Sequence, residues 1–133
     1  MAYLAGCSLN TTKNLAEFST VTVGEQTFKV EVAQDSFSRQ QGLMFRESLD
    51  LNAGMIFVFD EPGQHPFWMK NTLIPLDIIW ISAENIITDI TTMQPCALDP
   101  CPSYQPNELS LYVLEVGAGV FEGKIGDSVV FKP

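Results

Sequence analysis

Positively charged side chains are scarce in this sequence, and none of them are clustered. Seven Lys and Arg residues stand against sixteen Asp and Glu residues, so the formal net charge is −9. Because basic side chains that contact phosphates supply most of the affinity for nucleic acid, this composition argues against a nucleic-acid partner. It argues equally against electrostatic docking onto anionic lipid headgroups.

Several familiar signatures of membrane, catalytic and metal-binding proteins are also missing. No stretch approaches the roughly 20 apolar residues that a transmembrane helix needs. Neither a glycine-rich phosphate loop nor a Gly-x-Ser-x-Gly elbow occurs, and the single histidine, His65, supports no catalytic triad. A structural zinc site needs four nitrogen or sulfur ligands, and only His65 and Cys7 could join Cys96 and Cys101. We therefore expect neither a metal nor another cofactor.

What the chain does contain is enough apolar material for one folded domain. Hydrophobic residues make up 46% of its 133 residues and charged residues only 17%, a composition typical of a globular protein. A domain of this size buries roughly two-thirds of its unfolded surface. We interpret residues 18–133 as a single β domain, and residues 1–17 as a truncated signal segment with a polar tether.

The amino terminus contains a short motif that resembles a bacterial lipobox, Leu4-Ala5-Gly6-Cys7. In that interpretation Cys7 carries the lipid and anchors the protein to a membrane, since each buried methylene contributes about 0.8 kcal/mol. Only three residues precede the motif, so the basic and apolar regions of a signal peptide are missing. The alternative is an unmodified cysteine in a chance match.

The other two cysteines, Cys96 and Cys101, lie in a proline-rich loop, Pro95-Cys96-Ala97-Leu98-Asp99-Pro100-Cys101-Pro102. Proline stiffens the chain and favours turns, which can bring these two thiols into bonding range. We predict a disulfide here, worth about 2 kcal/mol in the loop-entropy model. Together, a lipid anchor and a disulfide indicate an extracytoplasmic location, in the periplasm or at the cell surface.

Alternating apolar and polar residues predict a mostly β fold. Between Asp35 and Gly42 the capping pattern predicts a short helix, and a second helical turn is expected at residues 120–122. We predict a compact barrel or sandwich of seven to eight short, mainly antiparallel strands. The predicted strands are residues 18–23, 26–32, 54–59, 67–70, 77–81, 86–93, 111–116 and 128–131.

Six motifs in order resemble the domain of unknown function 192 (DUF192) family, over about residues 28 to 131. They are Gly42-Leu43-Met44-Phe45-Arg46, Gly54-Met55 with Phe57 and Phe59, Phe67 to Thr72, Ile74-Pro75-Leu76-Asp77, Tyr112-Val113-Leu114-Glu115 and Gly126-Asp127. The resemblance implies a compact, mostly β domain that is often found in exported bacterial and archaeal proteins. It implies no activity, because none is established for the family.

The segment from Phe67 to Asp77 mixes apolar residues with charged and amide side chains. Burying such groups unpaired costs several kcal/mol, so each needs a partner or a function. One interpretation is a small-molecule site with an apolar wall of Phe57, Trp68 and Met69. Its candidate ligand-binding residues are Arg46, Trp68, Lys70, Asn71, Asp77 and Glu115.

Structural interpretations of the same residues remain open. Lys70 could pair with Asp77, and Arg46 with Glu115, while Asn71 bonds the backbone of a turn. Trp68 would then be a core anchor.

Our functional hypothesis is a lipid-anchored envelope domain that binds a small molecule, a glycan or an envelope partner. A small hydrolase that uses Asp77 and Glu115 as an acid/base pair is the first alternative. A purely structural interaction module is the second.

Overall fold

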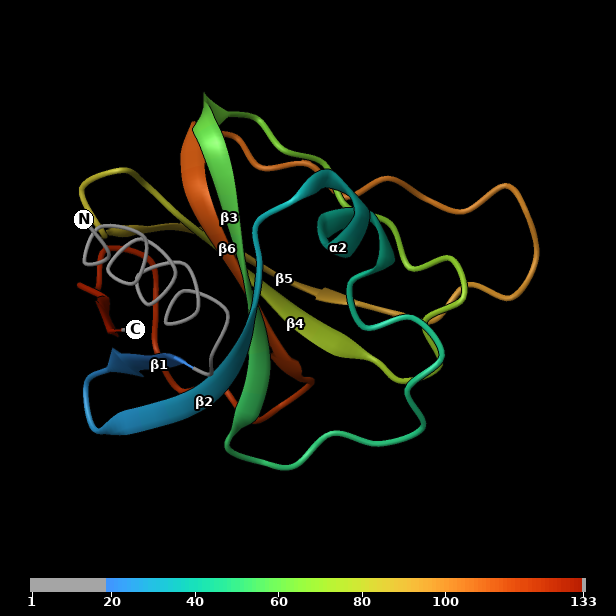
Figure 1. Cartoon of the computed structure of the whole chain (residues 1–133), viewed down its shortest axis with the longest axis horizontal. Helices are drawn as coiled ribbons and strands as arrows, with labels where there is room; N and C mark the ends of the chain where they lie inside the picture. Colours follow the sequence, from blue (N-terminus) through green and yellow to red (C-terminus); the bar gives the residue numbers. More distant parts are fainter. Residues whose placement is uncertain (1–18, 133) are drawn as a thin grey trace, which may run out of the picture.

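A seven-stranded β-sheet organises residues 19–132, which are the residues that the computed structural model describes (Figure 1). The strand order is β5-β4-β6-β3-β2-β1-β7, and only β2 and β3 run parallel. The strands are β1 (Ser19–Val23), β2 (Gln26–Ala33), β3 (Ala53–Gly63), β4 (Leu76–Ile81), β5 (Ile87–Met93), β6 (Ser110–Gly117) and β7 (Val130–Lys132). The predicted mostly β fold is confirmed.

The two predicted hairpins form because their turns suit tight reversals. Gly24 adopts a φ of +60° between β1 and β2, a conformation that glycine reaches without steric cost. Between β4 and β5, Asn85 adopts a φ of 65° in the second turn. Along β2, Phe28 and Val30 are buried while Lys29 between them is exposed, as the sequence alternation predicts.

The single described helix, α2 (Ser36–Gln41), leads from β2 towards the parallel strand β3. The side chain of Asp35 caps its first turn by accepting a hydrogen bond of 2.8 Å from the backbone N–H of Ser38. Gly42 ends it with a φ of +51° and donates its N–H to the carbonyl of Ser38. Both predicted caps are confirmed. Among residues 19–132, no helix is long and apolar enough to cross a lipid bilayer.

The sheet carries a hydrophobic core on each face, because side chains alternate along strands that are buried on both sides. The first core takes residues from β1 and β5, which lie far apart in the strand order, so the sheet curves around it. The second core lies on the face where α2 and the long loop of residues 94–109 are found, to the right of β3 and β6 in Figure 1. A bridge between Ile86 and Ser128 brings the two ends of the sheet together, but the sheet does not close into a barrel.

Two of the predicted elements, residues 67–70 and 120–122, are wrong because they are loops, and the last predicted strand is present with a shifted start. Residues 67–70 do not form a strand; Phe67 and Lys70 make only isolated bridges, to Tyr104 and Cys96 respectively. Residues 120–122 are not helical, so α2 is the only helix among the described residues. The last strand starts at Val130, two residues later than predicted. These segments have apolar side chains because they pack over the sheet as loops, and their sequence does not distinguish that role from a strand.

We predict that Gly42→Ala destabilises the fold more than Gly24→Ala does. Both positions have positive φ, which costs an L-residue roughly 1 kcal/mol. At Gly42 a new Cβ would also lie 3.3 Å from Cζ of Phe57, whereas at Gly24 it would meet nothing within 4 Å. Denaturant unfolding of the two variants should therefore show a larger loss for Gly42→Ala. Equal losses would show that the contact with Phe57 is tolerated.

Candidate functional site

A cavity of about 270 Å³ lies between α2 and the sheet, on the face of the second core. Residues at the end of α2, in the loops on either side and on the central strands line it. The apolar part of its lining consists of Leu43, Met44, Phe57, Phe59, Pro66, Phe67 and Trp68. The remaining lining residues are Arg39, Gln40, Gln41, Gly42, Thr72 and Glu115. The lining thus combines an apolar wall with several polar side chains, as small-molecule sites usually do.

Edge-to-face contacts fix the aromatic wall. The ring of Phe67 lies 4.9 Å from that of Phe57 at an angle of 86°, and 6.3 Å from that of Phe59 at 85°. Behind it, Phe67 also contacts the buried ring of Trp80 at 6.4 Å. Trp68 stands apart from this packing with 46% of its surface exposed, so it is not the core anchor considered above. It contributes the accessible edge of the wall.

Glu115 is the most buried of the polar residues that line this cavity. On β6 it lies opposite Met55 of β3 and Ile78 of β4, and only 4% of its surface is exposed. Within residues 19–132 its carboxyl group makes no hydrogen bond and no ion pair. Burial without such a partner raises the pKa of Glu115 to about 8, because the charged form loses its hydration. The group is therefore mainly neutral at pH 7.

Asp77 lies on the opposite face of the sheet from Glu115. In the register of β4 with β6, Asp77 pairs with Val116 and the next residue, Ile78, pairs with Glu115. The carboxylate of Asp77 accepts hydrogen bonds of 2.6 Å from the Thr92 hydroxyl and 3.0 Å from the Gly119 N–H. Because the sheet separates the two carboxyl groups, the predicted hydrolase pair of Asp77 and Glu115 is wrong.

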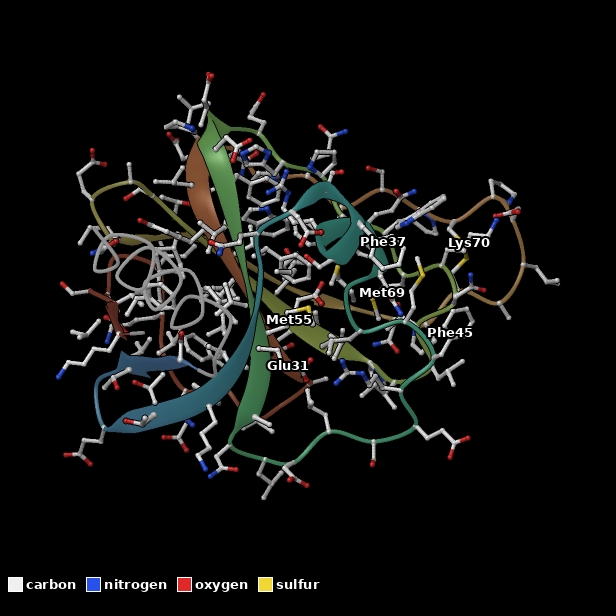
Figure 2. All side chains as sticks on the ribbon, in the orientation of Figure 1. Glu31, Phe37, Phe45, Met55, Met69 and Lys70 are labelled. Atoms are coloured by element: carbon white, nitrogen blue, oxygen red, sulfur yellow. A yellow bond between two sulfur atoms is a disulfide. The ribbon has the colours of Figure 1, made fainter. Side chains whose placement is uncertain are left out.

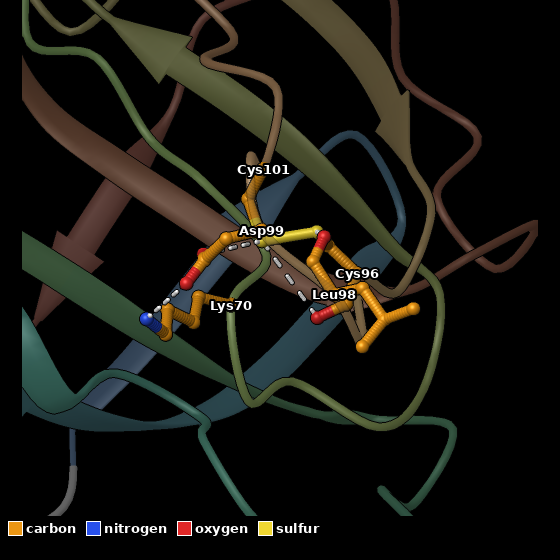
Figure 3. A network of polar contacts seen from close by, with 5 residues as sticks. All are labelled: Lys70, Cys96, Leu98, Asp99 and Cys101. Carbon is orange, nitrogen blue, oxygen red and sulfur yellow. Dashed lines mark hydrogen bonds and ion pairs between the residues drawn. A yellow bond between two sulfur atoms is a disulfide. The ribbon is translucent and has the colours of Figure 1, made fainter.

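The two predicted ion pairs, Lys70–Asp77 and Arg46–Glu115, are also wrong. Lys70 instead pairs with Asp99 in the cysteine loop, with 3.0 Å between Nζ and Oδ2 (Figure 3). Each cation lies near the surface, and there it reaches an acid from a different part of the chain.

Arg46 donates two hydrogen bonds, of 2.7 and 2.8 Å, to the carboxylate of Glu31 on β2. This pairing holds the pKa of Glu31 below its usual value. Figure 2 shows Glu31 beside Met55, its partner across the β2–β3 pair. Met55 in turn lies opposite Glu115 on β6, so β3 separates the Arg46–Glu31 pair from the cavity's carboxyl group.

Asn71 has the turn role that the structural interpretation gave it. It adopts a φ of 59°, in the left-handed region that asparagine tolerates well, and its carbonyl accepts a hydrogen bond from the N–H of Phe45. Phe45 itself has a φ of 66° and is 63% exposed. The neighbouring Thr72 is buried and lines the cavity. Of the six predicted ligand-binding residues, only Trp68 and Glu115 line it.

The predicted disulfide between Cys96 and Cys101 is confirmed, with 5.7 Å between the two Cα atoms (Figure 3). Cys7, the predicted lipidation site, lies outside the described residues. In the part of the chain from 19 to 132, no three His, Cys, Asp or Glu side chains come together as a metal site.

Comparison with known proteins decides the family. Residues 19–131 match the DUF192 family, which is described as an uncharacterized ACR. The chain belongs to the DUF192 family. This confirms the resemblance inferred from the six motifs, while no curated protein matches.

Two solved structures resemble this DUF192 domain along most of its length. A protein of unknown function from Novosphingobium aromaticivorans DSM 12444 is 34% identical, with a TM-score of 0.75 over 85% of this chain and 83% of that one. A putative transcription regulator from Sinorhizobium meliloti 1021 is 30% identical, with a TM-score of 0.74 over 86% of this chain and 92% of that one.

Sequence reasoning missed the contribution of α2 to the site of this DUF192 domain. Arg39 places its guanidinium 5.1 Å from the ring centroid of Phe59 and donates hydrogen bonds to the carbonyls of Gln34 and Val58. Gln40 and Gln41 line the cavity beside it. No local pattern in the sequence marks this contribution, because it depends on how the helix packs across the sheet.

We predict that Glu115→Gln removes a pH-dependent loss of stability from the DUF192 domain. The pKa of Glu115 is about 8 in the folded state against 4.5 for the free side chain, so the folded protein keeps a proton that the unfolded chain releases. Raising the pH between these values therefore favours unfolding, by roughly 1.4 kcal/mol per pH unit. From pH 5.5 to 8.5 wild type should lose roughly 3 kcal/mol relative to Glu115→Gln.

Denaturant unfolding at the two pH values measures this difference. Glu84→Gln is the matched control, because Glu84 is an exposed residue of the β4–β5 turn. The control should follow wild type. Parallel pH profiles for wild type and Glu115→Gln would contradict the assignment of a neutral buried acid.

Proposed function

We propose that this domain binds a small molecule in the cavity above Glu115. The observation that carries the proposal is a carboxyl group buried against apolar residues, unpaired within residues 19–132, at the end of an aromatic cavity. Such a group costs folding free energy, and a well-packed apolar residue would avoid that cost. A bound molecule that satisfies the carboxyl group gives a reason for its presence.

The shape of the cavity favours a small molecule over the other partners considered above. Its volume of about 270 Å³ lies just below the range for ligand sites, which starts near 300 Å³, so only a small ligand fits. Seven of the thirteen lining residues are apolar, so the cavity suits a ligand with an apolar body and a few polar groups.

A thermal-shift screen of aromatic fragments tests this function. We expect at least one fragment to stabilise the wild-type domain, because a ligand that binds only the folded state raises its apparent stability. Trp68→Ala should weaken that fragment about tenfold, which corresponds to about 1.4 kcal/mol. Leu109→Ala, which removes an exposed apolar side chain away from the cavity, should leave the shift unchanged.

The screen can also refute the proposal. If no fragment stabilises the wild-type domain, or if Trp68→Ala and Leu109→Ala affect the shift equally, then the cavity is not a binding site. The structural module would then be the better description of this domain.

We also propose that the protein is attached to a membrane outside the cytoplasm through a lipid on Cys7. The lipobox-like segment Leu4-Ala5-Gly6-Cys7 supports the anchor. The Cys96–Cys101 disulfide supports the compartment, since such bonds persist mainly in oxidising environments. In this proposal the acidic domain is held near the membrane by acyl chains and not by electrostatic attraction to lipid headgroups.

Fractionation of the full-length protein in its native host tests the anchor. Wild-type protein should enter the membrane fraction and resist extraction by salt, while Cys7→Ala should be released, because acyl chains supply the attachment. Ser8→Ala is the control and should fractionate like wild type. Identical fractionation of Cys7→Ala and wild type would overturn the lipid anchor.

A further inference from the structure

The Glu115 carboxyl group lacks a hydrogen-bond donor among the residues around it. A carboxylate offers about four acceptor sites, and buried ones are normally occupied. Across the sheet its neighbours are Met55 and Ile78, whose side chains cannot donate. Among the polar side chains that line the cavity, the Thr72 hydroxyl lies 3.4 Å from the Lys70 carbonyl and Arg39 Nη1 contacts two backbone carbonyls. Gln40 and Gln41 are exposed and make no hydrogen bond to Glu115. A ligand that carries its own donor can therefore satisfy Glu115.

Two rings of the aromatic wall make cation–π contacts with side chains of the protein itself. The Arg39 guanidinium lies 5.1 Å from the ring centroid of Phe59, and the Lys70 ammonium lies 5.6 Å from that of Trp68. The faces of such rings are negative, so they attract positive charge. Both rings line the cavity. Aromatic rings of this wall therefore accept positively charged neighbours.

The charged and titratable groups around Glu115 come from the helix, the loops and the sheet. The helix contributes Arg39, which lines the cavity and forms no ion pair within residues 19–132. The loop behind the wall contributes Lys70, paired with Asp99, and His65, stacked on Phe59. On the sheet, the Arg46–Glu31 pair lies beyond Met55, and Asp77 lies on the opposite face. Over longer distances the net charge of −9 favours the approach of a cation over that of an anion.

We infer that the ligand of this cavity is a small amine, whose protonated nitrogen donates hydrogen bonds to Glu115 while its apolar body packs against Phe57, Phe67 and Trp68. This inference rests on the proposed function and names its ligand class. The cavity volume limits the ligand to about one ring with a short side chain. An arylalkylamine has that size and both of the required parts.

Binding of an amine changes the protonation of Glu115. In the empty cavity at pH 7 the carboxyl group holds its proton, since burial raises its pKa to about 8. An ammonium group that donates to it favours the carboxylate, so the proton leaves for solvent and an ion pair forms. The ligand keeps its own proton, because the pKa of an alkylamine is near 10. About one proton should therefore be released per amine bound at pH 7.

Titration calorimetry of the full-length protein with three matched probes tests the ligand class. The probes are 2-phenylethylamine, 2-phenylethanol and phenylacetate, which share a ring and differ in the charge of the end group. We expect the amine to bind at least tenfold more tightly than the other two at pH 8. Its affinity should rise about tenfold from pH 6 to 7 and about fivefold from pH 7 to 8, and comparing buffers of different ionisation enthalpy should reveal the released proton.

A variant separates the role of Glu115 from that of the wall. Glu115→Gln should lower the amine-to-alcohol affinity ratio at least tenfold and abolish the proton release. Glu84→Gln removes the same charge from an exposed turn and should change neither quantity.

Each contrary outcome has a distinct meaning. If the alcohol or the carboxylate binds as tightly as the amine, or if the amine binds without releasing a proton, the amine class is wrong while the cavity remains a binding site. If none of the three probes binds and the fragment screen is also negative, the proposed function fails together with this inference.

Discussion

The alternation of side chains along β6 is the constraint on which the site depends. The strand pairs with β3 on one side and β4 on the other, so it can neither slip nor rotate without disturbing both neighbours. Leu114 and Val116 thereby enter one core, and Glu115 between them enters the other. The same register sends Asp77 to the far face. One fixed strand thus determines which acidic residue meets the cavity and which one serves as a structural anchor for Thr92 and Gly119.

The second core contains a cavity and a buried acid without a partner among residues 19–132, and a function is expected at such a place. A core is most stable when it contains only well-packed apolar side chains, and departures from that pattern tend to mark functional sites. Here the departures coincide, because a buried acid, a cavity and a half-exposed tryptophan share one side of the sheet. On the face of the first core the buried acid is Asp77, which is bonded by Thr92 and Gly119.

Local patterns in the sequence predicted most of the fold. Alternation along residues 26–32 and the capping residues Asp35 and Gly42 act within a few residues, so their structural meaning can be derived without knowing the rest of the chain. The disulfide was equally predictable, because its cysteines are only five residues apart. The family followed from the order of six motifs.

The site was only partly predictable, because it depends on contacts between distant segments. Lys70 pairs with an acid 29 residues away, and Arg46 with one 15 residues away. Several acids were available to each, and only the folded loops select one. The burial of Glu115 could be anticipated from its neighbours Leu114 and Val116. The position of Glu115 on the same face as α2 could not be anticipated, since no local pattern fixes how a helix packs across a sheet.

The neutral state of Glu115 also alters the charge that the protein presents to its surroundings. The formal net charge of −9 counts every Asp and Glu as ionised at pH 7. A carboxyl group with a pKa of about 8 is mainly protonated there, so the empty domain carries a charge closer to −8. Occupation of the cavity by an amine would leave that total almost unchanged, because the charge gained by Glu115 and the charge of the ligand cancel. The net charge of the protein therefore stays nearly constant when the cavity binds an amine.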